Sequence, residues 1–327
     1  MRSHRLFIFF NLLFYFVLHD TIRFFRGSTV ARCVGFMDRP VKRSRMSAAT
    51  QFSVSFEHIS AFKQMVDVMA SVLDRAPFTL QKSGTDVVIM VDTVDPNHVC
   101  ILQTRLLCSG HVCGDDPVSF CLGTCILSSC LKNVSSTSVV RMEKDVDCAD
   151  VFLHVIDSMT DNISMRFKLN TFDQEPERLP LDDIVFDITT EVSIPEMKKV
   201  LKLSQELKVN DIEFTIMESD KDSDGTSVVM MRGAGDAEFE RRLPSTSHAD
   251  SDRFVSRENE SNKNSSRVSY SATFVIAYLL KFVRPMEQHA LVMKFGNNAP
   301  MLMEYPLGVE KSFARIVLAP KIGNDDE

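Results

Sequence analysis

The stretch FSVSFEHISAFKQMVDVMASVLDRAPFTLQKSG, residues 52 to 84, sets the pattern on which the fold depends. It begins and ends with alternating apolar runs, which are typical of half-buried strands. Between these runs, apolar residues recur every three or four positions and so share one face of a helix; they are Ile59, Phe62, Met65, Met69 and Val72. The stretch therefore predicts a strand, an amphipathic helix and a second strand.

The same order returns in IVFDITTEVSIPEMKKVLKLSQELKVNDIEFTIME, residues 184 to 218. Pro195 suits the first turn of its helix. The apolar stripe of this helix consists of Met197, Val200, Leu201 and Leu207. A pattern that occurs twice in one chain indicates an internal duplication.

Each half continues in short strands around one further helix. We expect these helices over Cys125 to Val134 and over Thr273 to Arg284, where Pro285 ends the second. The predicted fold class is α+β, with two duplicated domains that each hold β-sheets and two helices on one face.

Composition marks the domain boundaries. The segment between the two halves is charged and holds two prolines, which is typical of an extended linker. A polar stretch inside the second half has the composition of a disordered loop. The predicted division is an N-terminal extension (1–49), a first domain (50–168), a linker (169–183), a second domain (184–323) with a polar insert (245–267), and an acidic tail (324–327).

The first 49 residues differ from the rest. Arg5 to Leu18 is an apolar run behind basic residues, similar to the core of a secretory signal and short for a membrane span. Arg39 to Arg45 is a basic cluster of the nuclear-import kind. Three readings remain: a cleaved targeting segment, a membrane anchor, or an upstream extension outside the working protein. We favour the third, with Met37 or Met46 as the functional start.

Overall composition narrows the chemistry. The net charge of −7 repels nucleic acid unless the positive side chains gather on one face. Eight cysteines occur without a C-x-x-C pair, so we expect buried free thiols in a reducing compartment rather than zinc or disulfides.

Known catalytic motifs are missing from the sequence. It contains neither a P-loop, nor a nucleophile elbow, nor H-E-x-x-H, so we expect no enzymatic activity and no cofactor. Asp220 to Gly225 resembles half of a calcium loop, but Met231 stands where a ligand Glu belongs, and a hairpin turn explains the stretch better. We interpret His98, beside Pro96 and Asn97, as a turn residue rather than a catalytic base.

Several motifs resemble the proliferating cell nuclear antigen family of DNA sliding clamps. The most specific is the end of the chain, APMLMEY followed by VLAPKIGNDDE; DPNHVCIL (Asp95 to Leu102), FVIAYLLKF (Phe274 to Phe282) and the helix after Pro195 are also similar to the family. The resemblance covers Phe52 to Ile322 in layout. It implies three chains in a ring around duplex DNA, a homotrimer that binds a clamp loader and clients in the nucleus.

The resemblance also implies that cations on the helices face the DNA, because phosphate is the feature that all duplexes share. Spacing supports this on two helices, where the basic residues share a face; a solvated helix face is the alternative for any single lysine. The predicted DNA-binding residues are Lys63, Lys132, Lys198, Lys199, Lys202, Lys281 and Arg284.

In the family, client proteins insert a short helical turn with hydrophobic and aromatic residues into an apolar pocket and add a strand along the linker, two known recognition modes. The residues that match this partner-peptide pocket are Val94, Val99, Ile101, Leu179, Pro180, Ala299, Pro300, Ala319, Pro320, Lys321 and Ile322. Pro176-Glu177-Arg178 departs from the family pattern in the linker. Ser223 stands where relatives carry the lysine that receives ubiquitin, so we do not carry that regulation over.

Ring closure would pair two edge strands, Asn162 to Leu169 of one chain and Asp236 to Leu243 of the next. Both alternate as strands do, although alternation fits an internal strand equally well. Two alternatives to a replication clamp remain at this point. One is a subunit of a heterotrimeric checkpoint clamp, and the other is a secreted or membrane-anchored interaction protein that uses Leu6 to Leu18.

Overall fold

The computed structural model describes residues 50–173, 184–218, 227–243, 268–296 and 299–321. The described residues contain four helices and sixteen strands, which follow the same order twice. The first half comprises β1 (Thr50–Phe56), α2 (Ile59–Val72), β2 (Arg75–Ser83), β3 (Asp86–Val94), β4 (Cys100–Val112), β5 (Val118–Gly123), α3 (Thr124–Leu131), β6 (Ser138–Asp145), β7 (Val151–Asp157) and β8 (Ile163–Leu169). The second half comprises β9 (Ile188–Ser193), α4 (Ile194–Glu206), β10 (Asp211–Glu218), β11 (Ser227–Ala234), β12 (Glu238–Leu243), β13 (Val268–Val275), α5 (Ile276–Val283), β14 (Ala290–Phe295), β15 (Met301–Pro306) and β16 (Phe313–Leu318).

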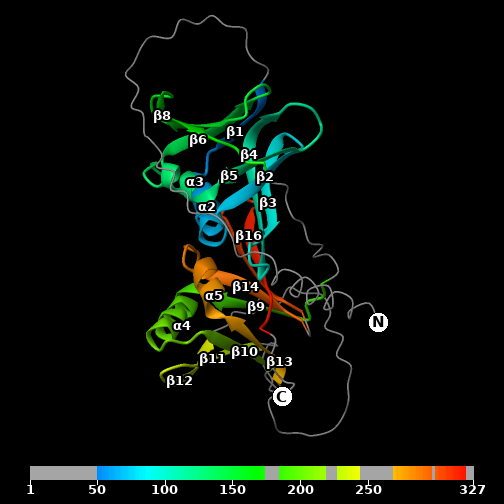
Figure 1. Cartoon of the computed structure of the whole chain (residues 1–327), viewed down its shortest axis with the longest axis vertical. Coiled ribbons are helices and arrows are strands. Elements are labelled where there is room, and N and C mark those ends of the chain that lie inside the picture. Colours follow the sequence, from blue (N-terminus) through cyan, green and yellow to red (C-terminus); the bar gives the residue numbers. More distant parts are fainter. Residues whose placement is uncertain (1–49, 174–183, 219–226, 244–267, 297–298, 322–327) are drawn as a thin grey trace, which may run out of the picture. The chain divides into compact units, whose positions relative to one another are not determined.

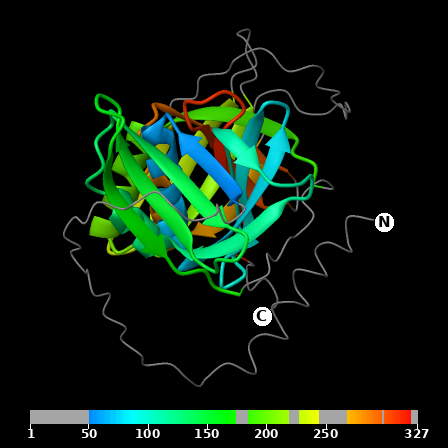
Figure 2. The same cartoon turned by 90° about the horizontal axis from the view of Figure 1, so that it is seen from above.

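The two halves also pair their strands in the same way. In the first half β1, β6, β7 and β8 are successive antiparallel neighbours, and in the second half β9, β14, β15 and β16 repeat that ladder. The set β5–β2–β3–β4 recurs as β13–β10–β11–β12. Figure 2 shows the β6–β8 strands of the first half, in green, beside β1, in blue. The α+β class and the duplication are confirmed.

Equivalent backbone hydrogen bonds fix which residues correspond. The N–H of Thr124 donates to Asp74 O, and the N–H of Ile276 donates to Asn210 O, each at 3.0 Å. After β8, Phe172 N donates to Cys121 O, and after β16, Lys321 N donates to Thr273 O. These bonds lie at matching places in the two halves.

One ladder joins the halves. β16 pairs with β4 antiparallel, from Phe313 opposite Arg105 to Leu318 opposite Cys100. This pairing merges strands of both halves into a single twelve-stranded sheet. In Figure 1 β16, in red, lies beside the strands of the first half. The remaining four strands, β10 to β13, form a separate sheet.

The four helices form one row. Helix α2 contacts α3 in its own half and α5 in the other half, and α5 contacts α4. Figure 1 shows this row along one side of the strands. The apolar stripe of α2 is fully buried as predicted, and so are Met197, Val200 and Leu201 of α4. Burial of such stripes, at roughly 25 cal/mol per Å² of apolar area, is the main stabilising contribution of these helices.

Four expectations need correction. Helix α5 begins at Ile276 rather than Thr273, because Thr273, Phe274 and Val275 continue the β13 ladder with β10 and are β-formers. Helix α3 runs from Thr124 to Leu131 and not to Val134. Among the described cysteines, Cys113 and Cys125 are exposed rather than buried. Leu207 lies past the end of α4, as its C-cap, and is half-buried.

Several predictions concern residues outside the described ones. These are the N-terminal extension, most of the linker with Pro176-Glu177-Arg178, the Asp220–Gly225 turn with Ser223, the polar insert and the acidic tail. The strands that flank the turn, β10 and β11, do pair antiparallel. No helix in the described ranges is long and apolar enough to cross a membrane.

Candidate nucleic-acid interface and docking surface

The helix row carries most of the predicted DNA-binding cations on its exposed side. Lys199 and Lys202 of α4 are largely exposed, with 70% and 78% of their side-chain surface accessible. Lys281 of α5 and Arg284 at its C-terminus are exposed as well. Each pair is three residues apart, and therefore projects from one face of its helix. These four residues form the cation cluster of the second half.

Lys63 and Lys198 differ from the cation cluster, because their ammonium groups bind backbone carbonyl groups. The ammonium group of Lys63 on α2 donates a hydrogen bond to Val134 O, just beyond the end of α3. Lys198 on α4 donates in the same way to Met286 O, beyond the end of α5. A cation at this place satisfies carbonyl groups that the helix leaves open and interacts favourably with the helix dipole. Because the two lysines are equivalent by duplication, we interpret both as structural links within a helix pair.

The first half presents fewer cations on its helices. Lys132, at the C-cap of α3, is exposed, and the remaining exposed positions of α3 include Cys125, Ile126 and Ser129. On α2, Asp67 is exposed and accepts a hydrogen bond from Ser128 Oγ at 2.8 Å. Positive charge on the helix row is therefore concentrated on α4 and α5.

Sequence reasoning missed one basic residue beside this cluster. Arg241 of β12 reaches α4, where its Nη2 donates to Glu196 Oε2 at 3.2 Å, while Lys199 Nζ pairs with Glu196 Oε1. These cations, Lys199 first, hold the pKa of Glu196 below its ordinary value. The carboxylate therefore stays ionised and orients two positive side chains. A contact between residues 45 positions apart leaves no periodic signal in the sequence.

The described residues of the predicted peptide pocket converge at the end of β16. Ile101 lies opposite Val94 on β3 and opposite Val317 on β16. Ala319 N donates to Val99 O at 3.0 Å. Ala299 and Pro300 lead into Met301, which pairs with Leu318. Val94, Ile101 and Ala299 are buried, whereas Val99, Pro300, Ala319 and Pro320 are half-buried and Lys321 is exposed; Leu179, Pro180 and Ile322 lie outside the described residues.

A buried carboxylate shapes the loop at this place. Asp95, only 1% exposed, accepts hydrogen bonds from the backbone of Asn97, Val99 and Cys100. Its Oδ2 also accepts from the hydroxyl of Tyr278 on α5 at 3.0 Å, and that hydroxyl accepts from Asn97 Nδ2.

Because Tyr278 belongs to α5, this network joins the β3–β4 loop to the helix that carries Lys281. The Nζ atom of Lys281 lies 5.4 Å from the centre of the Tyr278 ring. Within the loop, His98 has a positive φ of 56° and donates its N–H to Asp95 O. The interpretation of His98 as a turn residue is therefore confirmed.

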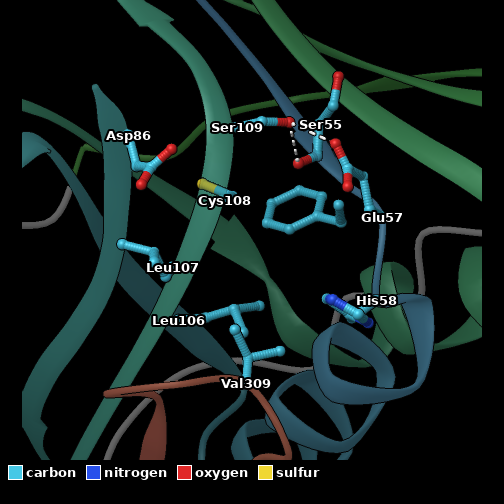
Figure 3. A pocket seen from close by; sticks show the side chains of 10 residues that line it. Ser55, Glu57, His58, Asp86, Leu106, Leu107, Cys108, Ser109 and Val309 are labelled. Atoms are coloured by element: carbon cyan, nitrogen blue, oxygen red, sulfur yellow. Dashed lines mark hydrogen bonds between the residues drawn. The ribbon is translucent and has the colours of Figure 1, made fainter.

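A cavity of about 250 Å³ lies elsewhere, between the start of β3, the middle of β4 and the β1–α2 junction. Figure 3 shows Asp86, Cys108 and His58 among the residues around the cavity, which Phe56 also lines. The hydroxyl of Ser109 donates to Ser55 O and to Glu57 Oε1. Burial, and secondarily Asp86, raises the pKa of the Cys108 thiol to about 12. The thiol is thus protonated at neutral pH and is not a nucleophile. None of the predicted pocket residues lines this cavity.

Strand β8 is a terminal strand of the twelve-stranded sheet, whose path ends at β9 on the other side, and β12 is a terminal strand of the four-stranded sheet, which ends at β13 on the other side. Strand β8 exposes Ile163 (56%) and Met165 (39%), and its polar side chains are exposed too. Strand β12 exposes four of its six residues and half-buries Phe239. Edge strands with exposed apolar side chains are unusual in a protein that stays monomeric.

Comparisons with known proteins agree with this architecture. Residues 51–178 match the model of the proliferating cell nuclear antigen N-terminal domain. The proliferating cell nuclear antigen of Chaetomium thermophilum is 25% identical over 275 residues, which cover 83% of this chain and 98% of the relative. The chain is thus similar to the proliferating cell nuclear antigen family, in the family model over its first half and in the relative over both halves.

More distant members show how widely the family fold extends. The DNA polymerase sliding clamp of Pyrococcus horikoshii is 23% identical over 277 residues, covering 83% of this chain and 98% of the relative. The crystal structure of the proliferating cell nuclear antigen of Entamoeba histolytica superposes with a TM-score of 0.63 at 20% identity, over 84% of this chain and all of that one. The duplicated fold of the family thus persists at low sequence identity.

Proposed function

We propose that the chain is the subunit of a homotrimeric DNA sliding clamp. Three copies form a ring that encircles duplex DNA without reading its sequence. The ring acts as a processivity factor for DNA polymerase and as a docking platform for replication and repair proteins in the nucleus, where a clamp loader places it on DNA. We assign no catalytic step and no cofactor to it.

This proposal rests on one observation: two strands that pair within the chain have counterparts in the other half that, among the described residues, have no such pairing. By duplication β8 is the counterpart of β16, and β12 is the counterpart of β4. The pair β16–β4 joins the halves within the chain, whereas β8 and β12 are both free edges. Pairing β8 with the β12 of a neighbouring copy would repeat the internal junction between chains. A head-to-tail contact of this kind closes into a ring when its rotation fits.

Exposed apolar side chains support this junction. Ile163 and Met165 lie on β8 itself. Ile126 of α3 is 54% exposed, and its counterpart by duplication is Tyr278 of α5, which contacts the β3–β4 loop across the internal junction. The β11–β12 loop of a neighbouring copy would cover Ile126 in the same way. Ring closure therefore removes three exposed apolar side chains from water, which favours assembly.

The cation cluster of the second half supports the DNA-binding role. In a ring whose helices line the hole, Lys199, Lys202, Lys281 and Arg284 would face the phosphates, with Lys132 as a weaker contribution from the first half. Exposed, flexible lysines exchange phosphate contacts readily, since they bind through charge and not through base edges. Such contacts hold a duplex loosely enough for the ring to slide.

The docking role rests on the convergence of the pocket residues at the end of β16. Pro320 cannot donate to a ladder, and Ala319 and Pro320 stay half-buried beside Val99. We propose this surface as the site for a short client peptide with hydrophobic and aromatic side chains.

The test is to replace Lys199, Lys202, Lys281 and Arg284 together with alanine. We expect the trimer mass to stay unchanged, and the stimulation of polymerase processivity by the clamp to be lost, because the phosphate contacts are gone. The matched control replaces four lysines away from the helix row, Lys82, Lys144, Lys294 and Lys311, and should retain stimulation. Unchanged processivity in the first variant would refute the DNA-binding assignment.

A further inference from the structure

We propose that a charge pattern on the two edge strands restricts the ring to copies of this same chain. Arg166 and Lys168 of β8 would lie opposite Glu240 and Glu238 of β12 in the neighbouring copy. The inference rests on the proposed ring, and it specifies which chains can assemble into that ring. It distinguishes a homotrimer from a ring of different subunits.

The internal junction supplies the register. Within the chain, Ile316 of β16 lies opposite Leu102 of β4. The duplicated backbone bonds of Phe172 and Lys321 make Phe167 the counterpart of Ile316. The ladders that lead from β2 and β10 make Phe239 the counterpart of Leu102. Phe167 would therefore face Phe239 across the junction between copies.

Both phenylalanines are half-buried and pack against the hydrophobic core. Cross-strand aromatic pairs are favourable at this spacing. The aromatic pair fixes one face of the junction, and the residues on either side of it point to the other face.

The first charged pair has a template inside the chain. Arg315 of β16 lies opposite Gln103 of β4, and its Nη1 donates to Gln103 Oε1 at 3.3 Å. The counterpart of Arg315 is Arg166, and the counterpart of Gln103 is Glu240. The arginine is thus retained at the junction between copies, while the amide is replaced by a carboxylate. An arginine–carboxylate pair is stronger and more directional than an arginine–amide pair.

The second pair lies two residues further on the same face. Lys168 would be opposite Glu238, at positions where the internal junction has the apolar pair Val317 and Ile101. The change from apolar to oppositely charged side chains occurs on both strands together. Complementary charge at two adjacent cross-strand positions specifies partner and register.

These charged groups are exposed and already oriented in the single chain. The Arg166 guanidinium lies 4.5 Å from the centre of the Phe152 ring, and Lys168 pairs with Asp150 at 2.7 Å. Glu240 pairs with Arg232 at 2.7 Å, on the side away from the free edge. Glu238 is exposed.

The other charges of β12 are compatible with this register. Arg242 would face Ser164, and Arg241 would face Met165, so neither meets a like charge. By contrast, two β8 strands would bring Arg166 and Lys168 together, and a foreign edge without the acidic pair would leave them unmatched. Like charges across an interface suppress wrong partners.

The experiment reverses the charges on the full chain. One variant carries Arg166→Glu and Lys168→Glu, a second carries Glu238→Lys and Glu240→Lys, and a third combines all four changes. We expect the concentration at which the trimer dissociates to rise more than about tenfold in the first two variants, and to return toward the wild-type value in the third. The matched control variant carries Lys82→Glu and Lys311→Glu, two changes outside β8 and β12, and should assemble as the wild type does.

Mixing gives the decisive readout. When wild-type chain and the fourfold variant are combined and examined by native mass spectrometry, we expect separate homotrimers and almost no mixed rings. The milder exchange of Arg166→Glu with Glu240→Arg provides the same comparison should the fourfold variant fold poorly. Free mixing, or unaltered assembly of the single-edge variants, would overturn the charge pattern. A wild-type chain that forms no trimer would instead overturn the proposed ring.

Discussion

At the scale of single residues, the side-chain hydroxyl groups of Tyr278 and Tyr305 differ in their hydrogen bonding. The hydroxyl of Tyr278 donates to the buried carboxylate of Asp95. The hydroxyl of Tyr305 is buried, and no described protein atom forms a hydrogen bond with it. Burial is the main cause that raises the pKa of both phenols, to about 12 for Tyr278. Both hydroxyls are therefore neutral at physiological pH, and only their hydrogen bonding differs.

This difference predicts opposite effects of the same substitution. Tyr278→Phe should lower the free energy of unfolding by about 1–3 kcal/mol, since a hydrogen bond to a buried charged group is lost. Tyr305→Phe should be neutral or slightly stabilising, because it removes a buried polar atom that has no partner. Urea denaturation at a fixed chain concentration measures both. Equal effects of the two substitutions would contradict the assigned hydrogen bond.

The sequence predicts such residues only in part. Spacing along α4 and α5 predicts that Lys199, Lys202, Lys281 and Arg284 are exposed, because periodicity determines the side of a helix on which a residue lies. Spacing does not show where a long side chain ends, so Lys63 and Lys198 could not be recognised as links to the end of a neighbouring helix. The bond between Asp95 and Tyr278 joins positions 183 residues apart, and only the folded chain brings them together.

At the scale of elements, strand β7 carries a buried histidine next to the β8 edge. His154 lies between Arg141 on β6 and Arg166 on β8 in the ladder, and its Nε2 is 3.4 Å from Glu143 Oε2. Burial is the largest cause that lowers the pKa of His154 below its ordinary value; Arg166 and Arg141 act in the same direction and Glu143 opposes them.

The direction of that shift predicts how stability depends on pH. Because the folded pKa of His154 lies below the unfolded one, the unfolded chain binds more protons near pH 6. The contribution of His154 to the free energy of unfolding should therefore be largest above about pH 6.5, the ordinary pKa of histidine, and should fall as the pH drops below it. In His154→Gln this decrease should be smaller, whereas His111→Gln, at an exposed position on β4, should behave as the wild type. An identical pH dependence in the His154 variant would contradict this role.

Elements themselves follow from the sequence where patterns are strong. The stripe from Ile59 to Val72 and the alternation of β8 both predict their elements correctly. The start of α5 was predicted too early, because Thr273 to Val275 is apolar enough for a helix and becomes strand only through pairing with β10. Whether β8 and β12 are edge or internal strands also could not be read from alternation, since both kinds alternate.

At the scale of the whole molecule, the duplication determines which strands pair within the chain and which strands remain at the edges of the sheets. It places one junction inside the chain, between β16 and β4, and leaves their counterparts β8 and β12 as terminal strands. The order of elements reveals the duplication in the sequence, but the correspondence of Phe167 with Ile316 needs the ladders. The proposed ring, the inward cations and the charge pattern all depend on this repeated junction.

The proposed ring is tested most directly by the mass of the full chain in solution, measured by sedimentation equilibrium. The repeated junction predicts a discrete species with the mass of three 37.0 kDa chains, which dissociates only on dilution. A mass that stays at one chain over the whole accessible concentration range, or a species of two chains, would contradict the ring.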